Sequence, residues 1–405
     1  MERQPQQPAY PRFIAHFAVI DRDNDPLQSR GFVEGTLGRF TSRFAVASLM
    51  CVAIAFTACG GGSSTRGGAT AGADRSFLMG ISTLPRELNG KAYSDTFDLA
   101  SRHGEMVLIQ RTPPWADFVP GADVSEETAK TTASEKDAID SKHLRLLFAI
   151  DPTDGSTGRD RLAGLPASMA GKDFSDADVR SAFLTYAQYV AINYHPAYVA
   201  LGVEMNLYSQ KNKDDFENFK SLYFEAYDRV KAASPDTQVT VTWQYEDMQG
   251  KLPTEDKHFP AWQLIKAFDS KMDVAAISTF PSFAYARASD IPDNYYSQLR
   301  GFTDKPIVIA EMGYSSAAGA QGINNGSEAE QTAFVSRALT EAQDLKMPFI
   351  VWFAGWDPSY AKDTAFSVFQ HIGLLREDGS EKPAWAPWAG AALRPYVAPG
   401  TTGAP

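Results

Sequence analysis

From Asp74 onward, short apolar runs alternate along the chain with longer amphipathic stretches. The runs are almost continuously apolar, as expected for parallel strands that are buried on both faces. Eight of them occur, at residues 77–82, 106–110, 144–150, 198–203, 238–243, 274–279, 307–310 and 349–353. Eight strands separated by helices predict an α/β fold, a closed (β/α)8 TIM barrel formed by a single domain.

The amphipathic stretches between these runs predict the helices of the barrel. The clearest cover residues 176–194, 214–233 and 327–346, and the last begins with a capping box in which Ser327 precedes Glu330. The alternative fold, an open doubly wound sheet, would have a glycine-rich phosphate loop after its first strand. The segment from Gly80 to Pro85 contains one glycine, so the barrel is the favoured fold.

In a barrel of this type the active site lies at the carboxyl ends of the strands. The polar and aromatic residues at the ends of the apolar runs are Gln110, Arg111, Asp151, Glu204, Trp243, Gln244, Tyr245, Thr279, Phe280, Glu311 and Trp352. Glu204 and Glu311 directly follow apolar stretches, where an ionised carboxylate is costly to bury. These two glutamates are the predicted catalytic pair, whereas Asp151, which precedes Pro152, is interpreted as the start of a turn.

Two carboxyl groups that face each other across a cleft are what glycoside hydrolysis requires. One is protonated and gives its proton to the leaving oxygen, and the other is ionised and attacks the anomeric carbon. We expect Glu204 to be protonated before attack, and Glu311 to stay ionised through hydrogen bonds or a cation such as Arg111. A separation of about 5 to 5.5 Å between the two carboxyls would produce a covalent intermediate and retained configuration.

In this arrangement the chain resembles clan A of the retaining barrel glycosidases, which includes cellulases, mannanases and galactanases. The resemblance extends over residues 77–388 and is carried by short segments in the expected order. They are residues 276–281 (AISTFP), 310–314 (AEMGY), 350–352 (IVW), 373–379 (GLLREDG) and 382–385 (KPAW). The resemblance implies a β-glycosidase whose acid/base follows strand 4, at Glu204, and whose nucleophile follows strand 7, at Glu311.

Position 203 departs from the pattern of the clan. Val203 stands where the clan normally has an asparagine that binds the sugar 2-hydroxyl, and Asn206 is the candidate to replace it. An alternative function is therefore a carbohydrate-binding surface lipoprotein on the same barrel, with weak or no catalysis. A structural lipoprotein that binds no sugar is a third hypothesis, and the aromatic residues at the strand ends argue against it.

Four further residues are predicted to contribute to the substrate site. Trp352 matches the clan's strand-8 tryptophan and would stack on a pyranose, with a core aromatic as the alternative. Trp243 and Tyr314 are predicted to line the cleft. Arg111 resembles the clan's strand-2 arginine, which keeps the nucleophile ionised, with a structural ion pair as the alternative.

Composition restricts the partners and cofactors. The formal net charge is -11 and no cluster of Lys and Arg occurs, which argues against a nucleic-acid partner. The six histidines do not have the spacing of metal ligands, so no metal and no cofactor are expected. The expected partner is a carbohydrate substrate, bound by a monomer.

The N-terminal region reads as an export signal. Arg39 and Arg43 precede an apolar run at residues 44–58, which is followed directly by Cys59. This segment resembles the bacterial lipoprotein signal, in which the cysteine becomes lipidated after cleavage; a short transmembrane helix is the weaker alternative. The resemblance implies export and a lipid anchor at Cys59 in a bacterial membrane, on the periplasmic face or the cell surface.

The chain is thus expected to have four parts. Residues 1–58 form the signal region, with translation expected to start near Val33 or Leu37, and residues 59–73 form a glycine- and serine-rich tether. Residues 74–393 form the barrel domain. Residues 394–405 are rich in proline, glycine and threonine and are expected to be a disordered tail.

Overall fold

The computed structural model describes residues 74–252, 260–319, 326–362, 364 and 366–398, all within one compact unit. Its strands are β1 (Leu78–Ser82), β2 (Met106–Arg111), β3 (Arg145–Ile150), β4 (Tyr198–Ala200), β5 (Gln238–Thr240), β6 (Thr242–Gln244), β7 (Ala275–Thr279), β8 (Ile307–Met312) and β9 (Phe349–Trp352). Its α-helices are α1 (Gly90–Arg102), α2 (Glu126–Ser141), α3 (Ala177–Tyr194), α4 (Met205–Lys211), α5 (Lys213–Ala233), α6 (Tyr245–Met248), α7 (Gln263–Phe268), α8 (Glu328–Asp344) and α9 (Trp385–Ala392).

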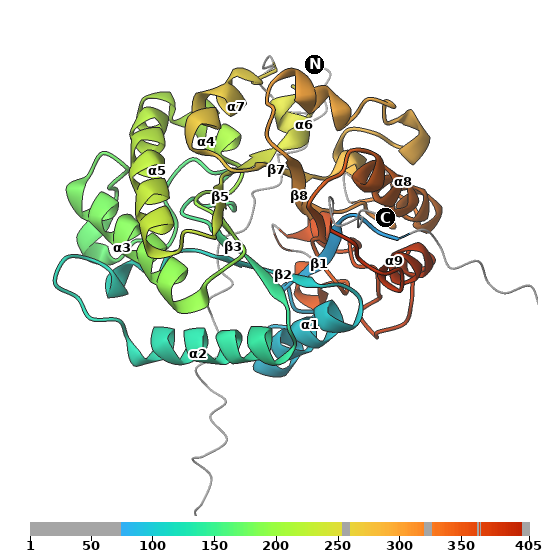
Figure 1. The fold of residues 1–405 in the computed structure, drawn as a ribbon, viewed down its shortest axis with the longest axis horizontal. Helices are drawn as coiled ribbons and strands as arrows, with labels where there is room; N and C mark the ends of the chain where they lie inside the picture. Colours follow the sequence, from blue (N-terminus) through green and yellow to red (C-terminus); the bar gives the residue numbers. More distant parts are fainter. Residues whose placement is uncertain (1–73, 253–259, 320–325, 363, 365, 399–405) are drawn as a thin grey trace, which may run out of the picture. The chain divides into compact units, whose positions relative to one another are not determined.

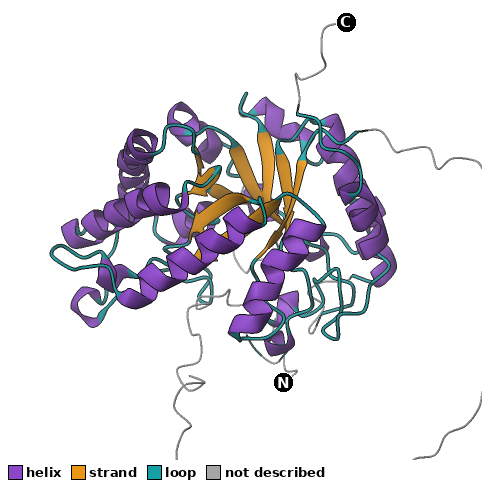
Figure 2. Cartoon of the chain, turned by 60° about the horizontal axis from the view of Figure 1, so that its bottom comes forward, coloured by secondary structure: helices purple, strands orange, loops and turns teal. Residues whose placement is uncertain are grey.

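The strands close into a barrel with helices around it (Figure 1, Figure 2). They pair in the order β5-β4-β3-β2-β1-β9-β8-β7-β6, and every pair is parallel. The two ends of this order, β5 and β6, are separated in the chain only by Val241 and are two halves of one strand. The sheet is therefore closed, and the predicted TIM barrel is confirmed, with its eight strands at the predicted apolar runs.

The three predicted helices are present as α3, α5 and α8, and α3 and α8 begin with side-chain caps, whereas α5 has none. Asp176 accepts hydrogen bonds from the first turn of α3, and Ser327 accepts one from the backbone of Glu330 in α8. Helix α2 begins after Ser125, whose side chain accepts from the Thr128 N–H. The sequence analysis had not singled out α2, although Ser125 followed by two acidic residues is a typical helix start.

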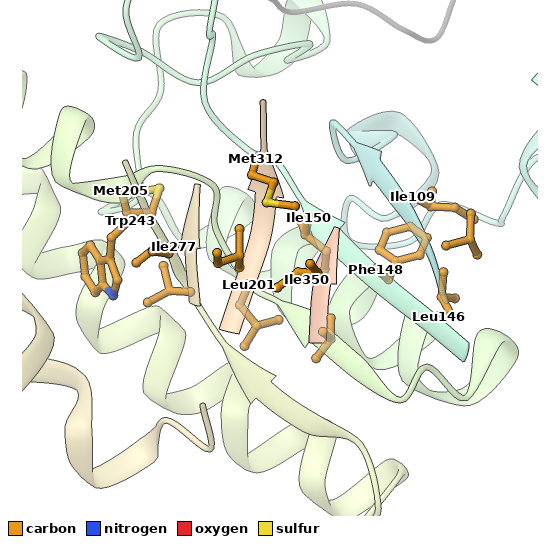
Figure 3. Packing of buried hydrophobic residues seen from close by; sticks show 14 of the residues in the cluster. Ile109, Leu146, Phe148, Ile150, Leu201, Met205, Trp243, Ile277, Met312 and Ile350 are labelled. Carbon is orange, nitrogen blue, oxygen red and sulfur yellow. The ribbon is translucent and has the colours of Figure 1, made fainter. Parts of the chain in front are cut away.

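Apolar side chains form two layers on opposite faces of the strands. One layer joins strand residues to helix residues and lies between the barrel and its helices (Figure 3). The other consists almost wholly of strand residues and fills the barrel interior: Leu78, Met106, Leu108, Leu147, Ala149, Ala200, Val203, Val274, Ala276, Val308, Ala310, Phe349 and Val351. Successive residues in a strand point to opposite faces, so each strand end directs its side chains alternately into the barrel mouth and toward the helices.

The C-terminal residues continue past the predicted domain boundary. Tyr396 forms a parallel bridge with Arg75, and the Arg75 N–H donates to the Pro395 carbonyl at 2.8 Å. Residues 394–398 are therefore ordered against the start of the first strand, and for them the expectation of a disordered tail was wrong. The signal region, Cys59 and the tether lie outside the described residues. Within the described part of the chain, no helix is long and apolar enough to cross a membrane.

Candidate active site

Glu204 follows β4 at the mouth of the barrel, and polar groups from three other segments hold it. Its carboxyl accepts a hydrogen bond from Ser278 Oγ of β7 at 2.6 Å and another from Arg159 Nε at 3.1 Å. Its backbone N–H donates to Thr242 Oγ1 of β6 at 2.9 Å. The residue is 5% exposed, so these donors rather than water solvate the carboxylate.

The backbone at Glu204 departs from the regular strand. Its φ is 50° and its ψ is 43°, in the left-handed region that non-glycine residues rarely occupy. Two residues earlier, a Cβ on Gly202 would come within 2.7 Å of Met205 and 2.8 Å of Phe219, so only glycine fits there. Left-handed residues are commonly retained at functional sites, where the surrounding structure holds them.

Glu311 reaches the same mouth from β8 through a register irregularity. Ile277 of β7 is opposite Ile309, but the next residue, Ser278, is opposite Glu311, so β8 contains an extra residue. Ile309 and Met312 belong to the helix-facing layer, whereas Ala310 belongs to the interior layer. The β-bulge therefore turns Glu311 inward at a position where strict alternation would turn it toward the helices.

The environment of Glu311 favours its neutral form. The residue is 3% exposed, and its Oε1 atom is buried without a hydrogen-bond partner. Burial raises the pKa of Glu311 well above its ordinary value, and the charge of Glu204 raises it further. Arg159 opposes this rise, and Asp151 adds to it. Ser278, which donates to Glu204, lies opposite Glu311 in the strand pairing, so the two carboxyls lie near each other; their predicted separation of about 5 to 5.5 Å stays a prediction.

Arg159 and Asp151 complete the group; the sequence had given no role to Arg159 and only a turn to Asp151. Arg159 Nη1 donates to Asp151 Oδ1 at 2.6 Å and to Thr153 Oγ1 at 2.9 Å. Gln110 Nε2 donates to the second oxygen of Asp151 at 2.9 Å. Burial alone would lower the pKa of Arg159, but the charges of Asp151 and Glu204 raise it, so the guanidinium stays charged. Asp151 is thus part of the site rather than only the start of a turn.

A second buried carboxylate supports the mouth of β7. Glu246 follows β6 and accepts hydrogen bonds from Gln244 Nε2, Thr279 Oγ1, Tyr295 Oη and the Phe280 N–H, at 2.6 to 3.0 Å. Burial raises its pKa, while the bonds from Thr279, Tyr295 and Phe280 oppose the rise. All four groups are donors that fix the Glu246 side chain, and through Thr279 and Phe280 it holds the strand that carries Ser278.

Asn206 does not replace the asparagine of the clan. Its Oδ1 accepts from the Gln244 N–H at 2.8 Å, and its Nδ2 donates to the Gln244 carbonyl at 3.0 Å and to Asp247 Oδ2 at 2.6 Å. The side chain is fully buried and its amide is occupied by β6 and α6. Asn206 therefore fixes α4, the helix that follows Glu204, instead of contacting a sugar. Val203 lies in the barrel interior.

The two predicted tryptophans face the helices. Trp352 is on the same face of β9 as Ile350; it packs near Phe334 and Trp388, and its indole N–H donates to the Ile372 carbonyl at 3.0 Å. Trp243 packs edge-on against Phe268 and lies in the outer layer (Figure 3). Both are fully buried. The prediction of a stacking platform at Trp352 and a cleft wall at Trp243 is therefore corrected to core packing.

Tyr314 and Arg111 also lie away from the carboxyl pair. Tyr314 packs on Phe334 of α8, and its hydroxyl donates to the Tyr285 carbonyl at 3.1 Å. Arg111 points outward from β2 and forms an ion pair with Glu135 of α2, with one bond of 3.1 Å. It cannot serve as the cation for Glu311 in this arrangement, so its structural alternative is the correct one.

In the described ranges, no three His, Cys, Asp or Glu side chains are grouped so that they could hold a metal ion. The site instead contains a carboxylate with two side-chain donors, a carboxyl with a raised pKa, and a fixed cation. Two carboxyls in different environments can divide between them the tasks of nucleophile and proton donor.

Comparison with solved structures shows which proteins share this barrel. GH5_18 from Bifidobacterium longum subsp. longum, solved with Manβ1-4GlcNAc, superimposes with a TM-score of 0.60 at 15% identity, over 79% of this chain and 80% of that one. GH5_18 from Streptomyces cattleya, also with Manβ1-4GlcNAc, has a TM-score of 0.59 at 17% identity, over 82% of each chain. An exo-β-1,4-mannosidase from an Opitutaceae bacterium has a TM-score of 0.58 at 14% identity, over 80% of this chain and 61% of that one.

These similarities concern the fold. The chain shares its (β/α)8 barrel with these glycoside hydrolases, and at 14 to 17% identity the likeness shows the fold alone. No protein-family model and no curated protein matches the sequence.

Proposed function

We propose that this chain is a glycoside hydrolase that cleaves a β-glycosidic bond in an oligo- or polysaccharide with retention of configuration. The observation that carries the proposal is the pairing of Glu204 and Glu311 at one barrel mouth, in different environments: two side-chain donors hold Glu204, whereas burial raises the pKa of Glu311. Retaining hydrolysis needs this difference, because one carboxyl attacks the anomeric carbon while the other protonates the leaving oxygen.

The reaction takes place in two steps, the formation of a covalent glycosyl-enzyme and its hydrolysis. In the first, a carboxylate oxygen bonds to the anomeric carbon, the glycosidic C–O bond breaks, and the leaving oxygen takes the proton of the other carboxyl. In the second, that carboxyl removes a proton from water, the water oxygen bonds to the anomeric carbon, and the ester to the enzyme breaks. No cofactor enters either step.

The fold neighbours suggest which sugar to test first. Two of them were solved with Manβ1-4GlcNAc and a third is an exo-β-1,4-mannosidase, so β-mannosides are the first candidate substrates. The barrel domain would be incubated with aryl β-glycosides and with β-linked oligosaccharides, and the anomer of the first product would be read by proton NMR. We expect hydrolysis with retention, and a loss on the order of 10²- to 10⁴-fold in Glu204→Gln and in Glu311→Gln.

Two other outcomes would reject this function. Glycans that bind without products would support the carbohydrate-binding alternative, which Val203 and the occupied amide of Asn206 motivate. An α-configured first product would instead indicate inversion through a water, which requires carboxyls about 6.5 Å or more apart.

We also propose that the chain is exported and anchored to a membrane through Cys59. The apolar run before Cys59 and the glycine-rich segment after it motivate this proposal. Metabolic labelling with a fatty-acid analogue should label the wild type, and Cys59→Ser should be unlabelled and released from the membrane fraction. An unlabelled wild-type protein in the soluble fraction would contradict the anchor.

A further inference from the structure

Arg159 is 4% exposed, yet one of its three side-chain nitrogens has no protein partner. Its Nε donates to Glu204 Oε2 at 3.1 Å, and its Nη1 donates to Asp151 Oδ1 at 2.6 Å and to Thr153 Oγ1 at 2.9 Å. The third nitrogen, Nη2, has no hydrogen-bond partner among the described residues. A guanidinium carries two N–H donors on this nitrogen, and both remain available for a ligand.

The free nitrogen lies beside the Glu204 carboxyl. The guanidinium is planar, and Nη2 shares with Nε the face of the group that is turned toward Glu204. A sugar that is cleaved at this site must come within hydrogen-bond reach of Glu204. Its hydroxyl groups next to the cleaved bond are then brought close to Nη2.

The position of Arg159 is fixed before any ligand binds. Its backbone has a φ of 63° and lies in a small hairpin in which Thr153 bridges Leu162. A non-glycine residue in this left-handed conformation is kept there by its surroundings. Asp151, which holds the guanidinium, is itself held by Gln110 Nε2 at 2.9 Å. A donor that is already in place loses little entropy on binding, so Arg159 is suited to hold a ligand.

Two acceptors in the same group of side chains also lack a partner. Gln110 Oε1 and Glu311 Oε1 are buried, and neither accepts a hydrogen bond from the described residues. Because the amide nitrogen of Gln110 donates to Asp151, its amide oxygen is turned away from that carboxyl. Buried polar atoms are normally paired, and a hydroxyl group can donate and accept at once. A ligand with several hydroxyl groups could therefore pair with the free donor and with the free acceptors.

We propose that Arg159 binds the substrate through Nη2, which donates to the sugar hydroxyl next to the anomeric carbon. This inference rests on the proposed function and adds a substrate contact to that same site. Val203 lies in the barrel interior and the amide of Asn206 is occupied, so neither residue makes this contact. Hydrogen bonds to this hydroxyl strengthen in the transition state of glycoside hydrolysis. Arg159 should therefore increase the rate as well as the affinity.

The acidic side chains around Arg159 favour an uncharged sugar. Asp151 and Glu204 both form ion pairs with the guanidinium, and Glu311 belongs to the same group of interacting side chains. A uronic acid would bring a fourth carboxyl to a place where Arg159 is already shared by two, and like charges repel each other. The expected substrate is therefore a neutral β-glycoside. A wild type that prefers a β-glucuronide to the matching β-glucoside would overturn the inference.

The contact can be tested by changing the enzyme and the substrate together. The wild type and Arg159→Met would be assayed on nitrophenyl β-mannoside and on its 2-deoxy analogue, which lacks the hydroxyl. The loss of kcat/KM in Arg159→Met should be about 10- to 100-fold larger on the mannoside, as expected for one hydrogen bond from a charged donor. The comparison isolates the contact, because the lost support of Glu204 affects both substrates alike. Equal losses on both substrates would show that Arg159 acts only through Glu204, and would overturn the inference.

Two further variants control for folding and for the hairpin. Arg161→Met is the matched control, because Arg161 lies in the same hairpin, is mostly exposed and forms ion pairs with Asp154 and Asp160. It should leave the rates on both substrates unchanged, and a selective loss there would overturn the inference. If thermal unfolding shows that Arg159→Met is not folded, Arg159→Lys carries the same test, because it keeps the charge and lacks the planar fork.

A binding measurement separates this inference from the proposed function. If the wild type hydrolyses no glycoside, the glycosidase function is rejected, and calorimetric titration with Manβ1-4GlcNAc, the ligand of two fold neighbours, decides the contact. The affinity should fall by about 10-fold or more in Arg159→Met and stay unchanged in Arg161→Met. An unchanged affinity in a folded Arg159→Met, or a wild type that binds no sugar, would overturn the inference.

Discussion

The inner and outer faces of the same strand ends carry different chemistry in this barrel. At the end of β2, Gln110 points inward to Asp151, and its neighbour Arg111 points outward to Glu135. At the end of β6, Gln244 points inward to Glu246, and its neighbour Trp243 points outward to Phe268. Residues that are adjacent in the sequence thus serve different purposes, because one contacts the mouth and the other contacts the helices.

This comparison teaches that position at a strand end is not enough to place a residue in the site. The barrel mouth receives every second side chain, and the others stabilise the contact between strand and helix. Changes on the outer face should therefore alter the free energy of unfolding, whereas changes on the inner face should alter the chemistry.

The largest expected effect on stability is on the outer face, at Trp352. Trp352→Ala should lower the free energy of unfolding by about 3 to 5 kcal/mol, because it removes a buried ring and leaves a cavity among Phe334 and Trp388. Chemical denaturation measures the loss, and activity per folded molecule should be unchanged. A stable variant with weakened substrate binding would restore the stacking role predicted from the sequence.

The next effect concerns Arg111, a partly buried arginine on the outer face. Arg111→Met should cost about 3 kcal/mol, because it leaves Glu135 buried without its charged partner. The double variant Arg111→Met with Glu135→Leu should recover much of that stability, since no unpaired charge remains. Both variants should keep the pH profile of hydrolysis, because Arg111 and Glu135 lie away from the carboxyl pair. A changed profile in Arg111→Met would show that the outer pair reaches the chemistry.

Most of the fold was predictable from local pattern alone. Each strand corresponds to an apolar run, and the caps at Asp176 and Ser327 mark real helix starts, because burial and capping act on residues near one another in sequence. The orientation of Trp243 was also available in the pattern. Thr240 and Thr242 face inward. Because side chains alternate along a strand, Val241 and Trp243 face outward.

Part of the site was beyond sequence reasoning for physical reasons. Alternation along β8 would turn Glu311 outward, and only the bulge opposite Ser278, a feature of strand pairing, turns it inward. Arg159 lies in an irregular loop, and its side chain is placed by contacts with Asp151 and Glu204. Glu204 is far from it in the sequence. No periodic pattern marks such a residue, although an arginine in the loop after strand 3 could have been considered as a partner for the strand-end acids.

A smaller effect on stability should distinguish two buried glutamates, Glu311 and Glu246, by its dependence on pH. Glu311 binds its proton more tightly in the folded chain than in the unfolded one, because its pKa is raised from an ordinary value of 4.5. Wild-type stability should therefore fall as the pH rises from about 4.5 through that raised pKa. Glu311→Gln avoids this loss and should be more stable than the wild type near neutral pH, a difference that disappears in acid.

Glu246→Gln is the matched control for that measurement. Its carboxylate accepts from four donors, and an amide would turn its own N–H groups toward some of them, so this variant should be less stable than the wild type near neutral pH. Urea unfolding at a series of pH values compares the two variants. A stability difference for Glu311→Gln that does not change with pH would contradict the raised pKa.

The smallest expected change in stability comes from a comparison within the inner face, between two threonines of one strand. Thr242 Oγ1 accepts the backbone N–H of Glu204, whereas Thr240 Oγ1 donates to the Val274 carbonyl, deeper in the barrel. Thr242→Val and Thr240→Val should each cost about 1 kcal/mol, because each loses one buried hydrogen bond. Only Thr242→Val should also lower kcat, by about tenfold or more, since the left-handed backbone that aims the Glu204 carboxyl would lose its anchor. Equal kcat values in the two variants would mean that Arg159 and Ser278 alone hold Glu204 in place.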